Sequence, residues 1–376
     1  MGRLRYLTAG ESHGPALVAT VEGLPAGLRV SAEEFAGELA RRRLGFGRSP
    51  RMDFEQDKLE ILGGVRHGRT LGSPVAVVIH NTEWPKWVDA MDPEPREDLD
   101  EIRDTGRGQQ LTRPRPGHAD LVGALKYGYD DVRDALERAS ARETAARAVA
   151  GTLAKLLLRE VSITVISHVV NIGGEKVEDD VDPPGPAELE RIDESPVRCA
   201  DADAEKRMMA RVDEAKDNLE TLGGVIEIIA YGLPPGLGSH VHWDRKLSTR
   251  LAAACCSVQA MKGVEFGRGF ALADTPGSRA HDEIAYEDGT FRRETNRAGG
   301  LEAGMTNGQP LTMRVVMKPL SSLPQPLQTV DLDTHEGAEA ITQRSDVCAV
   351  PRAGVVLEHV VAIELADALL EKTGGD

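Results

Sequence analysis

Two histidines lie in short glycine-containing segments and are the side chains best suited to proton chemistry. His13 lies in Gly10-Glu-Ser-His-Gly14, and His118 lies in Arg113-Pro-Arg-Pro-Gly-His-Ala-Asp120. Prolines fix φ in the second segment and its glycine permits a turn, so this loop can hold a residue still. An imidazole delivers or accepts a proton near neutral pH, which predicts a general acid or base. The plainer alternative is an incidental histidine in a surface turn.

A run of arginines predicts an anion-binding pocket. The eleven residues from 41 to 51 include Arg41, Arg42, Arg43, Arg48 and Arg51 and no acid, although the whole chain has a formal net charge of −16. Arginine binds phosphate and carboxylate through paired hydrogen bonds, so this clustering favours a small anionic ligand. Together with the histidines it predicts acid chemistry on a phosphorylated substrate. A non-catalytic binder of phosphorylated small anions is the alternative left open.

Two further segments have the composition of ligand-binding sites. Ser140 precedes a helical pattern and is flanked by Arg138 and Arg142. The amides at the start of a helix attract anions, although a plain helix cap would also explain the serine. The segment from 296 to 308 has four glycines in thirteen residues, which lets the backbone approach a flat ligand closely.

The segment around Ser12 also matches G-x-S-x-G, the pattern of a serine-hydrolase nucleophile. That pattern needs a helix directly after the serine, whereas Pro15 is followed by residues that alternate like a strand. A serine hydrolase is therefore the less favoured alternative. No glycine pattern of a dinucleotide fold or a P-loop occurs. His240-Val-His242 lacks the further ligands of a metal site, and Asp346 beside Arg344 has the spacing of an ordinary ion pair.

The composition argues against several classes of function. Hydrophobic residues make up 40% of the 376 residues, which is enough for a large core. No apolar run approaches the length of a membrane span and the N-terminus lacks a signal peptide, so we expect a cytoplasmic protein. The net charge and an aromatic content of 4% oppose binding to nucleic acid. Four cysteines without disulfide or zinc spacing are expected to be buried thiols: Cys199, Cys255, Cys256 and Cys348.

Hydrophobic spacing predicts the elements that position these residues. Alternation predicts strands at 4–9, 16–22, 59–62, 75–79, 162–170, 225–232 and 313–317. Capping boxes that begin at Ser31 and Ser140 predict helices from 31 to about 44 and from 140 to 159. Asp244 is expected to cap a further helix, with an apolar stripe that runs to Met261 and turns the paired cysteines inward. A last helix is expected from 355 to 370.

The order of these elements predicts an α+β fold, because strands and helices come in uneven blocks. The acidic, proline-rich region 174–198 and the polar region 273–295 are expected to be surface excursions. Neither has the composition of an interdomain linker, and no repeat of fixed period occurs. We therefore expect one domain that comprises residues 1–376.

Taken together, six motifs resemble those of the chorismate synthase family. They are Gly-Glu-Ser-His-Gly at 10, Gly-His-Ala-Asp at 117, Arg-Ala-Ser-Ala-Arg-Glu-Thr at 138, Gln-Ala-Met-Lys-Gly-Val-Glu at 259, Asn-Arg-Ala-Gly-Gly at 296 and Gln-Arg-Ser-Asp at 343. The motifs occur in the order of the family. Because the resemblance runs from about Leu4 to Leu370, coincidence is remote.

The resemblance implies a β-α-β sandwich, in which long helices pack between antiparallel sheets, assembled as a homotetramer. It implies a lyase of the shikimate pathway that converts 5-enolpyruvylshikimate 3-phosphate into chorismate by loss of the 3-phosphate and a C6 hydrogen. Reduced FMN lends electron density to the substrate and recovers it. NADPH is implied as an indirect reductant, acting through the chain itself or through a separate flavin reductase, and the sequence leaves this choice open. No metal, membrane or nucleic acid is implied.

The resemblance also implies roles for individual residues. His13 is similar to the acid that protonates the departing phosphate, His118 to the residue that protonates or balances reduced flavin, and Asp346 to a carboxylate that relays a proton at the flavin. Arg42 and Arg48 match arginines that bind either NADPH or the substrate, and we favour the substrate. The same cationic pocket is expected to include Arg51, Arg115 and Arg142.

The flavin contacts that the resemblance implies are Arg138, Ala139, Ser140, Gln259, Ala260, Ala303, Lys318, Pro319, Leu320, Ser321, Ser322 and Arg344. Two positions depart from the family pattern, which usually has glycine at Ala303 and aspartate at Glu220. A methyl group at Ala303 is expected to crowd the loop or to require a negative φ. We therefore expect altered affinity for the cofactor without loss of activity.

Overall fold

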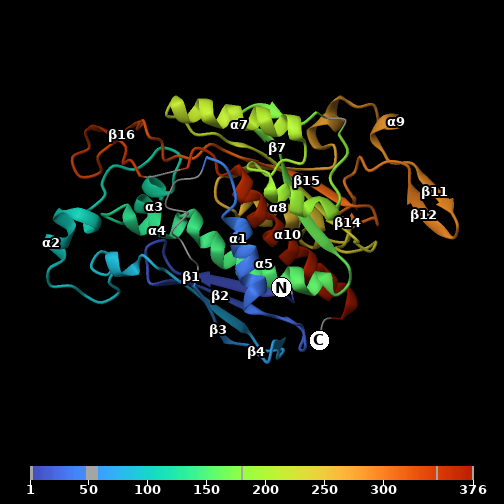
Figure 1. The fold of residues 1–376 in the computed structure, drawn as a ribbon, viewed down its shortest axis with the longest axis horizontal. Coiled ribbons are helices and arrows are strands. Elements are labelled where there is room, and N and C mark those ends of the chain that lie inside the picture. Colours follow the sequence, from blue (N-terminus) through green and yellow to red (C-terminus); the bar gives the residue numbers. More distant parts are fainter. Residues whose placement is uncertain (1–2, 48–57, 179–180, 344–345, 375–376) are drawn as a thin grey trace.

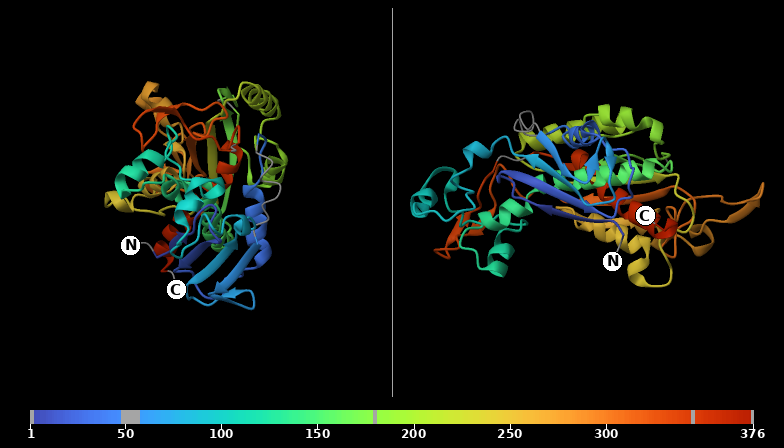
Figure 2. Two further views of the ribbon diagram at one scale, coloured as in Figure 1. Left: turned by 90° about the vertical axis from the view of Figure 1, so that its left-hand side faces the viewer. Right: turned by 90° about the horizontal axis from the view of Figure 1, so that it is seen from below.

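The computed structural model describes residues 3–47, 58–178, 181–343 and 346–374. Helices form a central layer with an antiparallel sheet on each side (Figure 1, Figure 2). Helix α5 (Thr144–Arg159) packs on one sheet, α10 (Val350–Thr373) packs on the other, and the two helices pack on each other. The expected α+β sandwich is confirmed.

The first sheet has the strand order β1 (Arg5–Ala9), β2 (Ala16–Glu22), β6 (Val75–His80) and β3 (Lys58–Gly63). All neighbouring strands are antiparallel. Alternate residues of each strand face the helices. Leu17 of β2 and Ile79 of β6 are two of them, and they pair with each other and are buried. The alternation that predicted these strands reflects burial of one sheet face, and each predicted end is within one residue of the observed one.

The second sheet has the strand order β10 (Met261–Phe266), β15 (Leu311–Met317), β9 (Gly224–Tyr231), β7 (Thr164–Ile172) and β8 (Glu175–Lys176). The prediction of β7, β9 and β15 is confirmed. The prediction that Met261 belongs to a helical stripe is wrong, because α8 (Leu247–Cys256) ends earlier and Met261 begins β10. Ala260 between them has a φ of 69°, a left-handed conformation that a helix does not continue through.

The central helices approach one another closely. α10 is buried around most of its circumference, because it lies between α5, the second sheet and α8. A Cβ atom added to Gly151 of α5 would lie 2.3 Å from Cβ of His359. Only glycine therefore allows α5 and α10 this separation.

The predicted helix start at Ser31 is confirmed without its full capping box, whereas the one at Ser140 needs correction. Ser31 caps α1 (Ala32–Arg42) by accepting a hydrogen bond from the Glu34 amide at 3.4 Å, but the Glu34 carboxylate binds an arginine of α5 instead of completing the capping box. Ser140 caps a 3-10 turn, and α5 begins only at Thr144. The carboxylate of Glu143 is recruited elsewhere, by Thr8 at 2.7 Å.

The prediction that Asp244 caps a helix is wrong. Its carboxylate binds His242 Nδ1 at 2.6 Å within a 3-10 turn before α8. The paired cysteines do not both face inward, because Cys255 is buried and Cys256 is exposed. Consecutive residues of a helix point in different directions, so one buried stripe includes only one of the two cysteines. The remaining cysteines are buried as expected.

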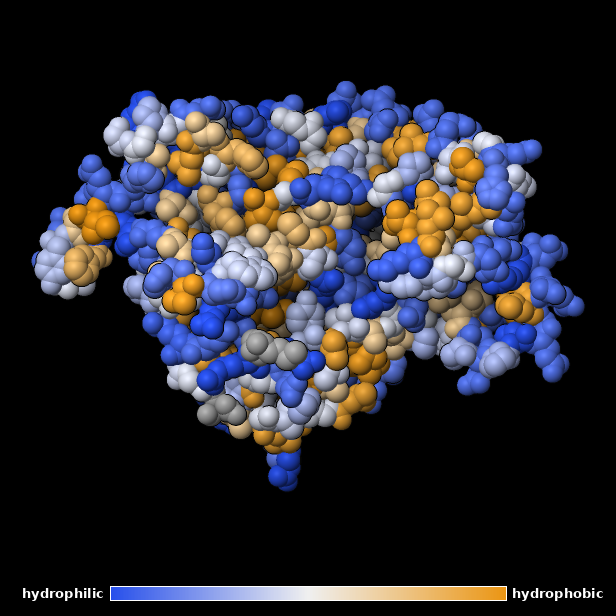
Figure 3. All heavy atoms as spheres, turned by 180° about the vertical axis from the view of Figure 1, so that it is seen from behind, coloured by the Kyte–Doolittle hydropathy of each residue, from blue (hydrophilic) through white to orange (hydrophobic). Residues whose placement is uncertain are grey.

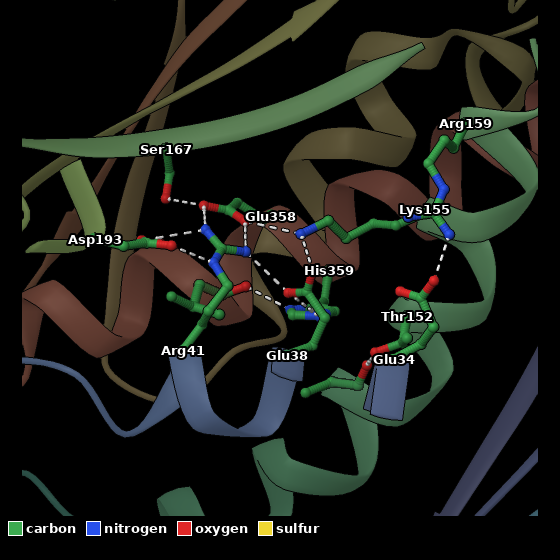
Figure 4. Close-up of polar contacts among 12 residues, drawn as sticks. Glu34, Glu38, Arg41, Thr152, Lys155, Arg159, Ser167, Asp193, Glu358 and His359 are labelled. Carbon is green, nitrogen blue, oxygen red and sulfur yellow. Dashed lines mark hydrogen bonds and ion pairs between the residues drawn. The ribbon is translucent and has the colours of Figure 1, made fainter. Parts of the chain in front are cut away.

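A buried cluster of charged side chains joins α1, α5 and α10 (Figure 4). Glu358 of α10 is fully buried and lies 2.8 Å from Arg41, 3.0 Å from Arg198 and 3.1 Å from Lys155. Burial raises the pKa of Glu358, but the three cations outweigh it and hold this pKa well below the usual range. The hydroxyl of Ser167 donates a further bond of 2.8 Å. The end of α1 is thereby fixed against α10.

The two expected surface regions differ. Region 174–198 is exposed or partly exposed over most of its described length, as predicted. The prediction is wrong for its end, which follows α6 (Leu189–Glu194), because Arg198 is fully buried and reaches Glu358. Region 273–295 is exposed as predicted. It forms a hairpin of β11 (Ile284–Glu287) and β12 (Thr290–Arg293) that projects from the body in Figure 1. Hydrophobic atoms mark this projection at the left edge of Figure 3. Exposed large hydrophobic residues of the hairpin include Ile284 in β11 and Phe291 in β12.

The remaining elements lie in the connections. They are β4 (Val65–Arg66), β5 (Arg69–Thr70), α2 (Leu99–Asp104), α3 (Asp120–Tyr127), α4 (Arg133–Ala139), α7 (Ala202–Asp217), α9 (Gly277–Ala280), β13 (Leu301–Glu302), β14 (Met305–Thr306), β16 (Gln328–Val330) and β17 (Gly337–Glu339). The two ends of the chain lie together, since the Leu4 amide donates to Asp367 at 2.7 Å. Over the described ranges, no helix combines the length and apolarity needed to cross a membrane.

Candidate active site

A cavity of about 470 Å³ lies where the first turns of α5 and α10 meet the loop between β1 and β2. This volume suits a coenzyme or a metabolite. Segments that are far apart in the sequence build its wall. The predicted site residues that line the cavity are His13, Arg42, Arg115, His118, Ala139, Ser140, Arg142, Gln259, Ala260, Lys318, Leu320, Ser321, Ser322 and Asp346.

Three described residues that were predicted to bind flavin do not line this cavity: Arg138, Ala303 and Pro319. Arg138 instead donates to the carbonyl oxygens of Thr8 at 2.9 Å and Gly10 at 3.1 Å, and so braces the loop of His13 from outside. Ala303 lies in the turn between β13 and β14 with a φ of 50°, which contradicts the expectation of a negative φ. Arg48, Arg51 and Arg344 lie outside the described residues.

The loop that carries His13 is held in one conformation. Gly10 has a φ of 104°, and a Cβ atom there would lie 2.3 Å from the Ala16 carbonyl oxygen. Both facts require glycine. The side-chain amide of Asn81 donates to the carbonyl oxygens of Ser12 at 3.3 Å and Gly14 at 3.0 Å. The short loop is therefore stiff enough to position a catalytic side chain.

His13 itself is fixed by a buried carboxylate and an aromatic ring. Its Nδ1 lies 2.8 Å and 3.0 Å from the two carboxylate oxygens of Glu137, which also accept the His13 amide at 2.8 Å. The ring of Trp87 stacks on the imidazole, with centroids 3.9 Å apart and an angle of 26° between the planes. The bond to Glu137 commits Nδ1, so a proton exchanged with a ligand is carried by Nε2.

His118 is fixed by a second buried carboxylate. Its Nδ1 donates to Asp120, which is fully buried and accepts from Arg115 Nε at 2.9 Å and from the Arg115 amide at 3.0 Å. Burial raises the pKa of Asp120, but the bonds from His118 and Arg115, with their charges, outweigh it and hold this pKa well below the usual range. Asp120 is thus an anion that orients the His118 ring.

Three buried arginines make part of the wall positively charged. Arg42, Arg115 and Arg142 are each no more than 8% exposed. Arg42 donates from Nε to the Thr144 hydroxyl at 3.0 Å and from Nη2 to the Ala141 carbonyl oxygen at 3.2 Å. Guanidinium groups held in this way are preorganised donors for phosphate or carboxylate.

Asp346 forms an ion pair of 2.6 Å with Arg352, a residue of α10 that the sequence analysis did not single out. Both residues line the cavity. Arg352 Nη2 is buried and has no hydrogen-bond partner among the described residues. Helix α10 therefore brings a further cation to the wall.

Gln259 brings an acceptor to the cavity. Its Nε2 donates to Glu143 at 3.2 Å, whereas its Oε1 is buried and finds no donor within the described parts of the chain. A buried acceptor without a donor costs about 1–3 kcal/mol, so a ligand N–H at this point would be favourable. Apolar side chains complete the wall: Leu136, Val258, Met261, Met317, Leu320 and Val356.

The serine-hydrolase alternative fails on geometry. Ser12 accepts a hydrogen bond from Ser140 at 3.2 Å, and the histidine beside it is bound to Glu137. The chain then enters β2, so no helix follows the serine as a nucleophile elbow requires. No group of three or more metal-ligating side chains is found in the residues that the structure describes.

Glu137, Trp87 and Arg352 are the site residues that sequence reasoning missed. Glu137 is 124 positions from His13, and no local pattern connects them. Trp87 lies in an irregular segment between β6 and α2. For His118 the sequence did contain a signal for its partner, because Asp120 lies two positions later within the Gly-His-Ala-Asp motif.

Comparison with known proteins gives a consistent result. A family model described as chorismate synthase matches residues 4–370. Chorismate synthase from Saccharopolyspora erythraea is 60% identical over 376 residues, covering 99% of this chain and 93% of the relative. The enzyme from Thermobifida fusca is 57% identical over 374 residues, covering 99% of this chain and 95% of the relative. A solved structure described as "Crystal Structure of Chorismate Synthase" is similar with a TM-score of 0.77 and 41% identity, covering 99% of this chain and 93% of the other.

Proposed function

This chain belongs to the chorismate synthase family, and we propose that the cavity bordered by His13 and His118 is where it acts on 5-enolpyruvylshikimate 3-phosphate. The activity is that of a carbon–oxygen lyase of the shikimate pathway, which releases phosphate and gives chorismate. The observation that carries the proposal is that two carboxylate-anchored histidines and three buried arginines converge on one cavity. Elimination of phosphate needs an anion held and protonated as it leaves, and this arrangement supplies both.

The substrate is proposed to bind against Arg42, Arg115 and Arg142. It carries a phosphate and carboxylates, and planar guanidinium groups bind such anions with two parallel bonds. Arg42 was also a candidate for NADPH. Its place in the wall shared with His13 favours the substrate phosphate instead. Arg48 and Arg51 remain predicted members of this pocket.

His13 is proposed to be the acid for the departing phosphate. When the carbon–oxygen bond breaks, its electron pair goes to the phosphate oxygen, and the proton on His13 Nε2 is transferred to that oxygen. The hydrogen at C6 leaves as a proton, which Asp346 is proposed to relay away, and the electron pair of the C–H bond enters the new double bond. One C–O bond and one C–H bond are thus exchanged for one new double bond, and the sum is chorismate and phosphate.

The family uses reduced flavin, and we propose that this chain binds it as FMN. When bound, reduced FMN supplies transient electron density to the substrate. The cavity suits such a group, because apolar walls accompany an unsatisfied acceptor, Gln259 Oε1, which can receive a ring N–H. His118 is proposed to hold or give a proton beside the flavin, and Asp346 to relay one. The residues proposed to hold FMN are Ala139, Ser140, Gln259, Ala260, Lys318, Leu320, Ser321 and Ser322.

The source of electrons and the assembly complete the proposal. NADPH is proposed to act indirectly, through a separate flavin reductase. One domain over residues 1–376, a homotetramer and a place in the cytoplasm are proposed on the same family resemblance.

Purified protein under anaerobic conditions tests the function. With chemically reduced FMN and 5-enolpyruvylshikimate 3-phosphate, phosphate and chorismate should appear in equal amounts. Folded protein that binds the substrate but releases neither product would support a non-catalytic binder and remove the assignment. Addition of NADPH with oxidised FMN, in place of reduced FMN, should give no product until a flavin reductase is added.

A further inference from the structure

Glu137 makes several bonds to one short segment of the His13 loop. Its backbone carbonyl accepts the Ser12 amide at 3.1 Å. Its Oε2 accepts the His13 amide at 2.8 Å, and its Oε1 lies 2.8 Å from His13 Nδ1. One residue of α4 therefore fixes both the backbone and the imidazole of a loop that is distant in the sequence.

The carboxylate of Glu137 lies where water cannot replace these bonds. Its side chain is 1% exposed, and that of His13 is 11% exposed. A further cation, Arg133, lies with its Nη1 3.8 Å from Oε1. A carboxylate buried to this extent is tolerated because donors surround it, so its geometry is tightly constrained.

Aromatic packing fixes the remaining freedom of the ring. Trp87 stacks on His13 at 3.9 Å, and the guanidinium groups of Arg107 and Arg133 lie 5.8 Å and 5.7 Å from the Trp87 ring centre. Stacking sets the plane of the imidazole, whereas the bond to Glu137 sets its rotation within that plane. The orientation of the ring is thus defined by two independent contacts.

We propose that Glu137 is a positioning residue for the reaction, because it holds the His13 proton on Nδ1 and thereby directs Nε2 to the leaving phosphate. The inference rests on the proposed role of His13 as the acid. A carboxylate only accepts, so Nδ1 must be the donor in both the neutral and the protonated ring. Proton transfer to phosphate then takes place from Nε2 alone, and the ring that remains is neutral with its proton on Nδ1.

Replacement by glutamine separates positioning from simple packing. Glu137→Gln retains the shape but has only one acceptor oxygen, whereas the two carboxylate oxygens serve the His13 amide and Nδ1. Either the backbone bond is lost, or the amide group donates to Nδ1 and moves the ring proton to Nε2. The variant should therefore change the tautomer or the position of the ring.

The tautomer can be measured in the wild-type protein without any substrate. Nitrogen-15 NMR of histidine-labelled protein, with the His13 signals assigned by loss in a His13→Asn variant, should show neutral His13 protonated on Nδ1. A neutral ring protonated mainly on Nε2 would overturn the proposal. This result does not depend on whether the chain makes chorismate, so failure of the positioning role and failure of the proposed function are distinguishable.

Kinetics of three variants complete the test. For Glu137→Gln we expect kcat to fall about 100-fold, with KM within about threefold of wild type, because a positioned general acid contributes about 10²- to 10⁴-fold. Glu137→Asp keeps the acceptors one carbon further away and should recover part of kcat. Asp134→Asn is the matched control, since this carboxylate lies on the same helix but is exposed, and it should leave kcat unchanged. A folded Glu137→Gln protein with wild-type kcat and an unchanged tautomer would contradict the proposal.

Discussion

Arg42 and Thr144 are joined across the edge of the cavity, although 102 positions separate them in the sequence. The bond runs from Arg42 Nε to the Thr144 hydroxyl over 3.0 Å and connects the last turn of α1 to the first turn of α5. Arg42 also lines the cavity. The two helices therefore hold a guanidinium group at the point proposed for the substrate phosphate.

Removal of that bond should weaken substrate binding. Thr144→Val keeps the shape but cannot accept from Arg42, and a hydrogen bond to a charged group is worth about 1.5–3 kcal/mol. We expect KM for the substrate to rise by about tenfold with little change in kcat. Steady-state kinetics measure both values. Thr152→Val is the matched control, because Thr152 is buried in the same helix but bonds only to the Ala148 carbonyl oxygen among its described contacts, and its KM should be unaltered.

The two histidines should be needed for turnover and dispensable for the cofactor. His13→Ala and His118→Ala each remove one proposed proton donor, so kcat should fall by about 10²- to 10⁴-fold. The dissociation constant for FMN, measured by fluorescence quenching, should stay within about threefold of wild type. Exposed His242 offers a control whose alanine variant retains full activity. Unchanged rates in both active-site variants would refute the acid roles.

Gln259 should contribute to flavin affinity. Gln259→Leu removes the buried acceptor, so a flavin N–H would lose its partner and the dissociation constant should rise by about fivefold. Isothermal titration with FMN measures the change. Ser257→Ala, two positions away on the exposed side of the turn, should bind FMN normally. Equal affinities for Gln259→Leu and wild type would place the flavin elsewhere.

The buried charge cluster should dominate the effect of mutations in α10. Glu358→Gln leaves the fully buried Arg198 and the partly buried Arg41 and Lys155 without their shared anion, which should lower the free energy of unfolding by about 3–5 kcal/mol. Glu364→Gln on the same helix should cost less than about 1 kcal/mol. Burial raises the pKa of Glu364. The positive charge of Arg250 opposes this shift, and the nearby acids Asp367 and Glu371 add to it. Urea unfolding of both variants gives the comparison, and equal losses would contradict it.

Acid should destabilise the protein through three carboxylates that are paired with neighbouring cations. Burial raises the pKa of Glu38, Glu358 and Asp120, but neighbouring cations and hydrogen bonds outweigh it and lower each value well below the usual range. A folded-state pKa below the unfolded one means that the unfolded chain takes up protons first. This stabilisation is therefore complete above the unfolded values of about 4 and is lost as the pH falls through the folded values. The urea midpoint should fall from pH 5 to pH 3, and a constant midpoint would disprove the claim.

Elements with one buried face could be predicted from the sequence. The strands β1, β2, β3 and β6 alternate because one sheet face packs on helices, and the motif residues around His13 and His118 could be placed in loops between such elements. β10 could not be predicted in this way. Its first residue, Met261, continues the helical spacing of α8, and the left-handed turn at Ala260 that separates them leaves no mark in the hydrophobic pattern.

Long-range polar partners also could not be predicted. Glu137 is one of the 61 acidic residues of the chain and lies on a short helix, and its value to His13 arises only when α4 reaches the loop after β1. Arg198 lies in an acidic, proline-rich stretch that looked like surface, yet the fold buries it against Glu358. Composition describes the neighbours of a residue along the chain, whereas these roles are set by neighbours in space.

The last helix of the chain supplies part of the cavity wall, since Arg352 and Val356 come from the first turns of α10. Residues near the N-terminus supply another part, with His13 and Arg42. A chain that is still being synthesised on the ribosome therefore has no complete site until α10 has emerged. A chain truncated before α10 should therefore bind neither substrate nor flavin at the proposed site, whatever the state of the sheets and of α5.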